Sequence, residues 1–294
     1  MYYRRKVILS LLQSFGDNLG KTKFQKLLLL LAKSQEKADY YFVPYKYGCF
    51  SFQAMADLST MQKYGQVSIS NRGIQKTDPV DYIKLLKEKD KNALRQVFLL
   101  HNKKTYSDLI KYTYRKYPYF AIHSEIADRY LTPDELQKVK QYKPVGNRSI
   151  LYTIGYEGIT LEEYLNKLIS NDVRVLVDVR NNPMSMKYGF TKSQLLNACT
   201  SVGIEYIHFP DVGIVSDQRQ ELTCQQDYDK LFNKYRVEIL PHTISTQEKI
   251  LGLLKDKGRI ALTCFEANIC QCHRKHLAEA IIRLPEWNYD LIHL

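Results

Sequence analysis

The chain has 294 residues, of which 45% are hydrophobic and 25% are charged. This composition is typical of a folded globular protein and excludes a disordered or collagen-like chain. The longest purely apolar run, residues 27–32, is far shorter than the roughly 20 residues that a membrane-spanning helix needs. The apolar stretch after the basic N-terminus is short and has no small-residue cleavage site, which argues against a secretory signal. We therefore expect a cytoplasmic protein without a membrane partner.

Positive charge is concentrated in the first half of the chain. Residues 1–149 contain 27 Lys and Arg against 13 Asp and Glu, a net charge of +14, whereas residues 150–294 contain 16 against 18. Since single cores usually stop growing at about 250 to 300 residues, this asymmetry predicts two domains with different partners. A basic domain favours phosphate-rich ligands, nucleic acid above all, although the excess charge could also serve solubility alone.

The first 80 residues have the pattern of a small helical module with a hairpin. Apolar residues at helical spacing predict three helices within residues 7–61. The aromatic segment 40–43 predicts a strand, and the alternation of residues 67–74 around a turn predicts a hairpin. These elements favour a basic, mainly helical, winged-helix-like domain over residues 1–145. In that geometry one helix enters a major groove while the hairpin contacts the backbone.

Two segments of this domain, Lys21-Thr-Lys-Phe-Gln-Lys26 and Pro44-Tyr-Lys-Tyr-Gly48, resemble the N-terminal modules of some bacterial antitoxin-like and phage-related proteins. The resemblance covers about 50 residues of the chain and implies binding either to nucleic acid or to a partner protein. Because cations neutralise phosphate charges, we expect nucleic acid to be contacted by Lys21, Lys23, Lys26, Lys46 and Arg72.

A segment rich in Pro, Gly, Asn and Ser, residues 143–149, separates this half from a second pattern. Beyond it, apolar strands alternate with helical stretches, which predicts an α/β domain over residues 150–294 with a mostly parallel sheet flanked by helices. In such sheets ligands bind beyond the carboxyl ends of the strands. The expected strands are residues 150–154, 173–177, 205–208, 259–263 and 289–293.

Polar motifs follow these strands in a recognisable order. They are Thr153-Ile-Gly155-Tyr-Glu-Gly158, Val177-Asp-Val-Arg180-Asn-Asn-Pro183-Met-Ser185, Gly203-Ile-Glu-Tyr-Ile-His208-Phe-Pro210 and Cys264-Phe-Glu266 with Cys272-His-Arg274. Together with the closing strand they resemble the bacterial "domain of unknown function 488" family over roughly residues 150–294. The resemblance implies a fold and a site but no reaction. One departure is Pro210-Asp-Val-Gly213, where many members carry an acidic residue, Leu and a Gly pair.

Cys272 is the first candidate for chemistry in this domain. It stands just before a predicted helix, where the dipole and the neighbouring cations His273 and Arg274 predict a thiolate with a lowered pKa. Asp178 could serve as a base, and Arg180 could hold an anion with Arg274. The predicted catalytic residues are Asp178, Arg180, Cys272 and His273, and the predicted substrate-binding residues are Gly155, Tyr156, Pro183, Ser185, Glu266 and Arg274.

A metal site is the alternative use of the same segment. Cys264, Cys270, Cys272 and His273 offer four zinc ligands, so zinc is a possible cofactor. Their spacing is irregular for a zinc knuckle, since two adjacent residues would have to reach one ion. Thiol or anion chemistry, a metal site and a structural pocket without chemistry all remain open at this stage.

These observations predict an enzyme that acts on nucleic acid or on a nucleotide-like anion, delivered by the basic domain. Two alternatives are a transcriptional regulator that binds a small ligand without catalysis and a toxin–antitoxin or defence-type protein that works through a partner protein.

Overall fold

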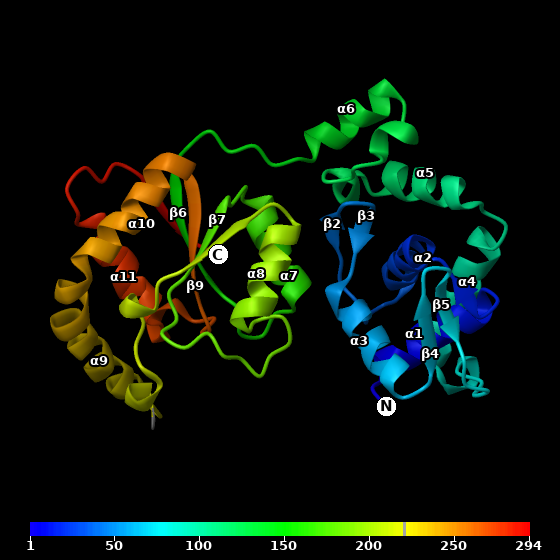
Figure 1. Ribbon diagram of the computed structural model, residues 1–294, viewed down its shortest axis with the longest axis horizontal. Helices are drawn as coiled ribbons and strands as arrows, with labels where there is room; N and C mark the ends of the chain where they lie inside the picture. The colour runs from blue at the N-terminus through cyan, green and yellow to red at the C-terminus, as the bar shows by residue number, and fades with distance from the viewer. Residues whose placement is uncertain (220–221) are drawn as a thin grey trace. The chain divides into compact units, whose positions relative to one another are not determined.

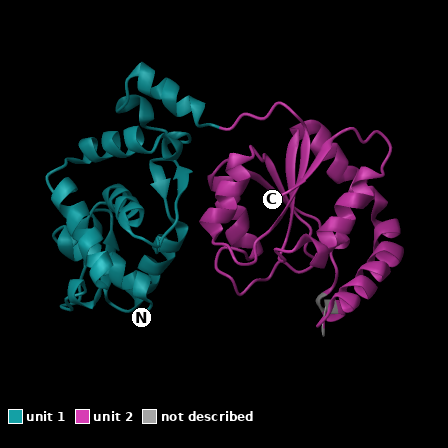
Figure 2. Ribbon diagram, turned by 180° about the vertical axis from the view of Figure 1, so that it is seen from behind, with its two compact units in different colours: residues 1–143 teal, residues 144–294 magenta. Residues whose placement is uncertain are grey.

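A computed structural model describes residues 1–219 and 222–294. The chain divides into two compact units, residues 1–143 and 144–294 (Figure 2). The division falls within the segment in which the sequence analysis placed the domain boundary. In the part of the chain described, no helix is both long and apolar enough to cross a membrane.

The N-terminal unit begins with three helices and a small antiparallel sheet. Helix α2 is buried along almost its whole length from Phe24 to Ala32, so it forms the centre of the core. The sheet has the strand order β1-β5-β4, in which Leu19 pairs with Ile74. These elements are α1 (Tyr3–Ser14), β1 (Asn18–Leu19), α2 (Lys21–Ser34), α3 (Phe52–Lys63), β4 (Val67–Ser70) and β5 (Gly73–Lys76).

The prediction of a strand over residues 40–43 was wrong for all but its last residue, because the strand in this region begins at Val43. β2 (Val43–Tyr45) pairs with β3 (Gly48–Phe50) in a separate two-stranded hairpin. Tyr40 and Phe42 are instead buried in the core, so their aromatic pattern reflects burial and not strand pairing. Pro44 is accommodated because a two-stranded hairpin leaves its outer edges unpaired.

The remainder of this unit is mainly helical. Its helices are α4 (Glu88–His101), α5 (Tyr106–Lys116) and α6 (Pro133–Gln141). Thr105 and Thr132 begin α5 and α6 as capping boxes, in which the threonine hydroxyl and an acidic side chain satisfy the free backbone N–H groups.

The C-terminal unit contains a five-stranded sheet in which every pair of neighbours is parallel, as the alternating pattern predicted. The strand order is β10-β6-β9-β7-β8. These strands are β6 (Ile150–Gly155), β7 (Val175–Asp178), β8 (Glu205–His208), β9 (Arg259–Cys264) and β10 (Asp290–His293).

Helices cover both faces of this sheet (Figure 1). α7 (Leu161–Ser170) and α8 (Lys192–Ser201) lie on one face, and α9 (Gln225–Lys234), α10 (Ile244–Lys257) and α11 (His273–Ile282) lie on the other. The chain therefore leaves β6 and β7 toward one face, but it leaves the central strand β9 toward the opposite face. Diverging connections of this kind open a crevice at the carboxyl ends of neighbouring parallel strands. Here the crevice lies where β6, β9 and β7 end.

A buried ion-pair network ties α1 to α3 in the N-terminal unit. Asp57 is 1% exposed and accepts hydrogen bonds from Arg4 Nε at 2.5 Å, Arg5 Nε at 2.8 Å and the Tyr40 hydroxyl at 3.0 Å. Burial by itself raises the pKa of Asp57, but these hydrogen bonds outweigh burial and hold the pKa below its usual value. The carboxylate therefore stabilises the fold above the pKa of the unfolded chain, about 3.9. This stabilisation is lost as the pH falls through the lower pKa of the folded protein.

We expect Asp57→Asn to lower the free energy of unfolding of residues 1–143 by about 3 kcal/mol at pH 7, because two arginines lose a buried partner. The difference from the wild type should shrink below about pH 4, as measured by urea unfolding at a series of pH values. Glu36→Gln is the control, because Glu36 and its partner Lys89 are 71% and 79% exposed. An exposed pair contributes at most about 1 kcal/mol, so equal losses in the two variants would contradict this account.

Candidate functional site

A pocket of about 310 Å³ lies at the carboxyl ends of β6, β7 and β9. The strand register brings these ends level, because Gly155 pairs with Cys264 and Asp178 pairs with Thr263. The pocket is lined by Tyr156, Arg180, Asn181, Asn182, Met184, Ser185, Met186, Ile214, Cys264, Phe265 and His273.

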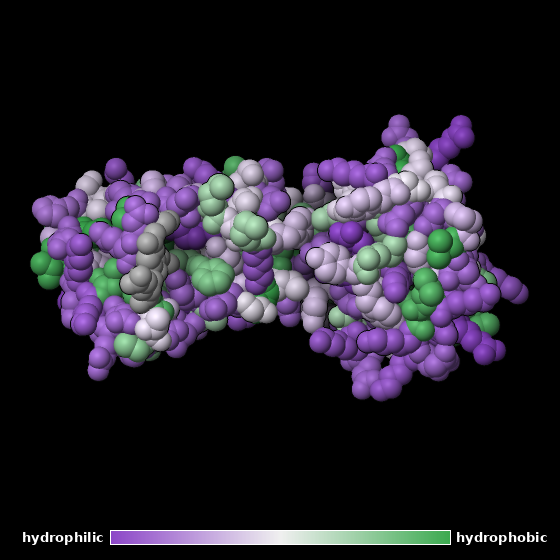
Figure 3. Space-filling view, turned by 90° about the horizontal axis from the view of Figure 1, so that it is seen from below, coloured by the Kyte–Doolittle hydropathy of each residue, from purple (hydrophilic) through white to green (hydrophobic). Residues whose placement is uncertain are grey.

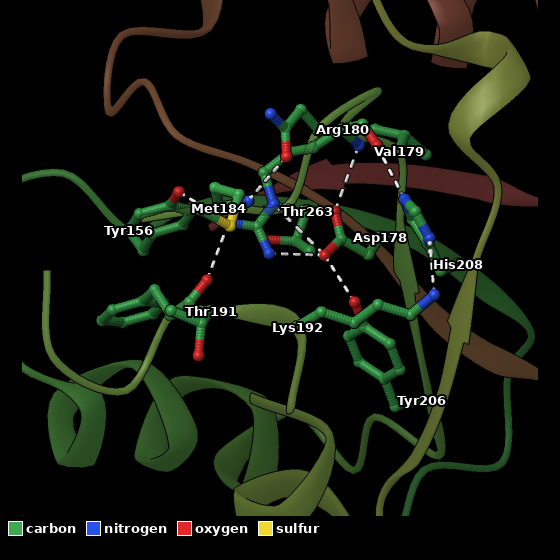
Figure 4. Close-up of polar contacts among 12 residues, drawn as sticks. Tyr156, Asp178, Val179, Arg180, Met184, Thr191, Lys192, Tyr206, His208 and Thr263 are labelled. Carbon is green, nitrogen blue, oxygen red and sulfur yellow. Dashed lines mark hydrogen bonds and ion pairs between the residues drawn. The ribbon is translucent and has the colours of Figure 1, made fainter. Parts of the chain in front are cut away.

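Arg180 is held in the pocket wall by a buried ion pair (Figure 4). Its Nε donates to both carboxylate oxygens of Asp178, at 2.9 and 3.1 Å, and its Nη2 donates to Oδ2 at 2.5 Å. Nη1 donates to the Tyr156 hydroxyl at 2.7 Å and to the carbonyl oxygen of Phe190 at 2.9 Å. The two charged side chains are 6% and 0% exposed. The guanidinium therefore occupies one fixed position.

Two neighbouring strands complete this network. The Tyr206 hydroxyl on β8 donates to Asp178 Oδ2 at 2.7 Å (Figure 4). His208, on the same strand, donates from Nε2 to the carbonyl oxygen of Arg180 at 2.8 Å, and its Nδ1 lies 3.2 Å from Lys192 Nζ. The rings of Tyr156 and Phe190 stack with their centroids 4.2 Å apart.

The position of Asp178 does not allow it to act as a general base on a ligand in the pocket. It is fully buried and does not line the pocket, and both its oxygens accept hydrogen bonds from Arg180 or Tyr206. Its role in this geometry is to position Arg180. Arg180 itself does reach the pocket, as the sequence predicted.

Cys264, Cys272 and His273 form a second cluster beside the pocket. Their three ligand atoms lie within 4.8 Å of one another, and the side chains are 1%, 0% and 1% exposed. Cys264 ends β9, Cys272 is the N-cap of α11, and His273 is the first residue of that helix. Cys264 Sγ lies 3.6 Å from His273 Nδ1, and His273 Nε2 donates to the carbonyl oxygen of Val179 at 3.0 Å.

The prediction of an activated Cys272 thiolate was wrong. The residue does cap a helix, but burial raises its pKa well above the usual value, and the neighbouring Cys264 and Glu266 raise it further. Arg274 acts in the opposite direction without compensating for these effects. Cys270, the fourth ligand in the alternative metal set, is exposed and lies outside the cluster.

Four of the predicted substrate-binding residues, Gly155, Pro183, Glu266 and Arg274, do not line the pocket. Arg274 is 1% exposed and donates to the carbonyl oxygens of Glu266 and Ala267, so it holds the loop after β9 and does not clamp an anion. A Cβ at Gly155 would lie 1.9 Å from the Glu266 carbonyl oxygen, so glycine is required there for close packing. Pro183 accepts a hydrogen bond from the backbone N–H of Lys192 at 3.1 Å and does not line the pocket. Tyr156 and Ser185 do line it.

The five residues predicted to contact nucleic acid differ in the exposure of their side chains. Lys21, Lys46 and Arg72 are exposed, and Lys23 is half-buried. The prediction for Lys26 was wrong, because its side chain is buried and its Nζ donates to the carbonyl oxygen of Tyr47 at 2.6 Å. Burial also lowers the pKa of Lys26.

Several residues of this region were not singled out from the sequence. Asn181, Asn182 and Phe265 line the pocket, and each follows the end of a buried strand, so the rule of carboxyl-end binding could have found them. Tyr206 carries no such signal, because its contact with Asp178 depends on the order of the strands in the sheet.

Residues 160–281 match the family described as "Domain of unknown function DUF488". The matched range extends from the start of α7 into α11 and includes Arg180, Cys264, Cys272 and His273. Searches of curated proteins and of solved structures found no match.

We predict that substitutions of Asp178 and Arg180 have strongly non-additive effects on the free energy of unfolding. Asp178→Asn and Arg180→Gln should each lower the free energy of unfolding of residues 144–294 by about 3 to 5 kcal/mol, because each leaves a buried partner unpaired. The decrease in the free energy of unfolding of the double variant should be smaller than the sum of the two single decreases, by at least about 2 kcal/mol. Denaturant unfolding measures all three values.

Asp172 and Arg174 provide a matched pair with the same two-residue spacing. Their ion pair of 3.3 Å is 26% and 48% exposed, so its coupling should stay below about 1 kcal/mol. Additive losses at residues 178 and 180 would show that the buried pair does not act as a unit.

Proposed function

Since the C-terminal unit belongs to the DUF488 family, whose description names no activity, we propose from the geometry that this unit is an enzyme acting on a nucleotide-like anion. The observation that carries this proposal is one pocket lined by an oriented cation, an exposed aromatic ring and a Cys–His pair. The N-terminal unit binds nucleic acid in this proposal and places the enzyme near its substrate.

The pocket lining suits the parts of a nucleotide. Phe265 is 42% exposed and offers a ring against which a base can stack. Asn181, Asn182 and Ser185 provide amide and hydroxyl groups for phosphate or sugar oxygens. Arg180 adds a guanidinium whose position is fixed before the ligand arrives.

The N-terminal unit has features that support a winged-helix-like module. Three helices precede a hairpin, and β1 joins that hairpin as a third strand next to β5. The pairing of Leu19 with Ile74 places Lys21 and Arg72 beyond the same end of this small sheet. Hydrophilic side chains cover much of the face of this unit seen in Figure 3, in keeping with its basic composition. Because residues 1–149 carry a net charge of +14, a phosphate backbone is the partner that this unit favours.

One observation favours a second candidate, a ligand-binding regulator without catalysis. Asp178, the expected base, is fully engaged with Arg180 and Tyr206 and does not line the pocket. A regulator of this kind would bind a nucleotide at the same place without converting it.

We expect Phe265→Ala to weaken the binding of nucleoside 5′-phosphates by about fivefold or more, because a stacked base contributes about 1 to 3 kcal/mol. Isothermal titration calorimetry measures the affinity, and chromatography of the recovered ligand measures conversion. Val237→Ala is the control, because Val237 is 73% exposed and does not line the pocket. Binding without conversion would favour the regulator, and the absence of binding would contradict the proposed site.

The double substitution of Lys21 and Lys23 by Ala should reduce the salt dependence of DNA binding. Each lost phosphate contact lowers the slope of log K against log salt by about 0.9, so the expected reduction is about 1.8. The control replaces Lys138 and Lys140, which are exposed on α6 and carry the same charge. Equal slopes for the two double variants, measured by fluorescence anisotropy, would show that α2 does not contact DNA.

A further inference from the structure

We propose that Cys264, Cys272 and His273 bind one zinc ion whose fourth coordination position opens into the pocket. The proposal goes beyond the nucleotide function, because it depends only on these three side chains and their surroundings. Two thiolates and one imidazole are a ligand set found at catalytic zinc sites.

The spacing of the ligand atoms fits a tetrahedral ion. Zinc bonds of about 2.3 Å to sulfur and about 2.0 to 2.1 Å to nitrogen place a sulfur and a nitrogen about 3.6 Å apart at the tetrahedral angle. Cys264 Sγ and His273 Nδ1 are 3.6 Å apart, and all three ligand atoms lie within 4.8 Å of one another. Little movement is needed for the three to reach one ion.

The backbone explains how adjacent residues can face the same ion. Cys272 is the N-cap of α11 and has extended dihedral angles, φ −133° and ψ 133°, whereas His273 is the first helical residue. The change of conformation between them turns both side chains toward Cys264. The irregular spacing in the sequence is therefore compatible with a shared ion.

The surroundings of His273 also suit metal binding. Its Nε2 donates to the carbonyl oxygen of Val179 at 3.0 Å, which fixes the ring and leaves Nδ1 as the nitrogen that faces the sulfurs. Ligating histidines usually donate their other N–H to a carbonyl or carboxylate oxygen in this way.

The cluster is closed on one side and open on the other. Cys272 is fully buried and does not line the pocket, whereas Cys264 and His273 both do. An ion held by all three would therefore have its free position toward the pocket. When Zn²⁺ binds, the two thiols release their protons to solvent, and a water molecule fills the fourth position. If the pocket takes the proposed nucleotide-like anion, this water would attack a phosphorus atom of that anion, the P–O bond to the leaving oxygen would break, and the leaving oxygen would take up the proton that the water loses. This step alone depends on the proposed function.

Metal content of the full chain tests the proposal without any nucleotide. The protein is purified without a metal-affinity tag, reduced, loaded with zinc and dialysed, and its zinc is then measured by elemental analysis. We expect one zinc ion per chain for the wild type and for Cys270→Ser, a matched control because Cys270 is exposed in the same loop. Cys264→Ser, Cys272→Ser and His273→Gln should each weaken zinc binding by at least about a hundredfold in competition with a chelator.

Cobalt binding to the wild type keeps the test independent of how the variants fold. Co²⁺ bound by two thiolates and an imidazole should give the strong d–d absorption of a tetrahedral site and a thiolate charge-transfer band. Failure of the reduced wild type to bind zinc or cobalt would overturn the proposal. So would a loss of zinc in Cys270→Ser equal to that in Cys272→Ser, or full zinc content in a folded His273→Gln variant.

Discussion

The buried ion pair between Asp178 and Arg180 is the interaction on which the candidate site depends. Two charges that are almost fully withdrawn from water would be costly without partners, and here each atom that could form a hydrogen bond is directed at a neighbour. Arg180 reaches Tyr156 at the end of β6, and Asp178 accepts from Tyr206 on β8. The pair thereby joins three strands at the edge where the pocket opens.

The backbone of residues 179 and 180 forms further hydrogen bonds at the site. The carbonyl oxygen of Val179 accepts a hydrogen bond from His273, and that of Arg180 accepts one from His208. Three consecutive residues therefore organise both an oriented cation and the Cys–His cluster on α11. This explains why the site lies beside the central strand β9, where the connections to opposite faces of the sheet diverge.

Much of this arrangement could be predicted from the sequence, because alternating strands and helices determine which loops meet at one edge. The five parallel strands and the polar residues that follow them were predicted within a few positions. Burial could not be predicted in the same way. Cys272 and Cys270 are two residues apart, yet one is fully buried and the other is exposed, and a helix-cap argument applies to the first without revealing this. Lys26 was misplaced for a related reason, since residues 24–32 of α2 are all buried and the ring of Tyr114, far along the chain, covers the Lys26 cation.

The central claim is that a nucleotide-like anion binds beside Arg180 in the same pocket that a zinc ion on the Cys–His cluster would face. A crystal structure of the full chain with zinc and a nucleoside 5′-phosphate, recorded at the zinc absorption edge, tests this claim most directly. We predict an anomalous peak between Cys264, Cys272 and His273, with the ligand in the pocket beside Arg180 and Phe265. Zinc bound elsewhere, or a nucleotide bound only outside this pocket, would contradict the account.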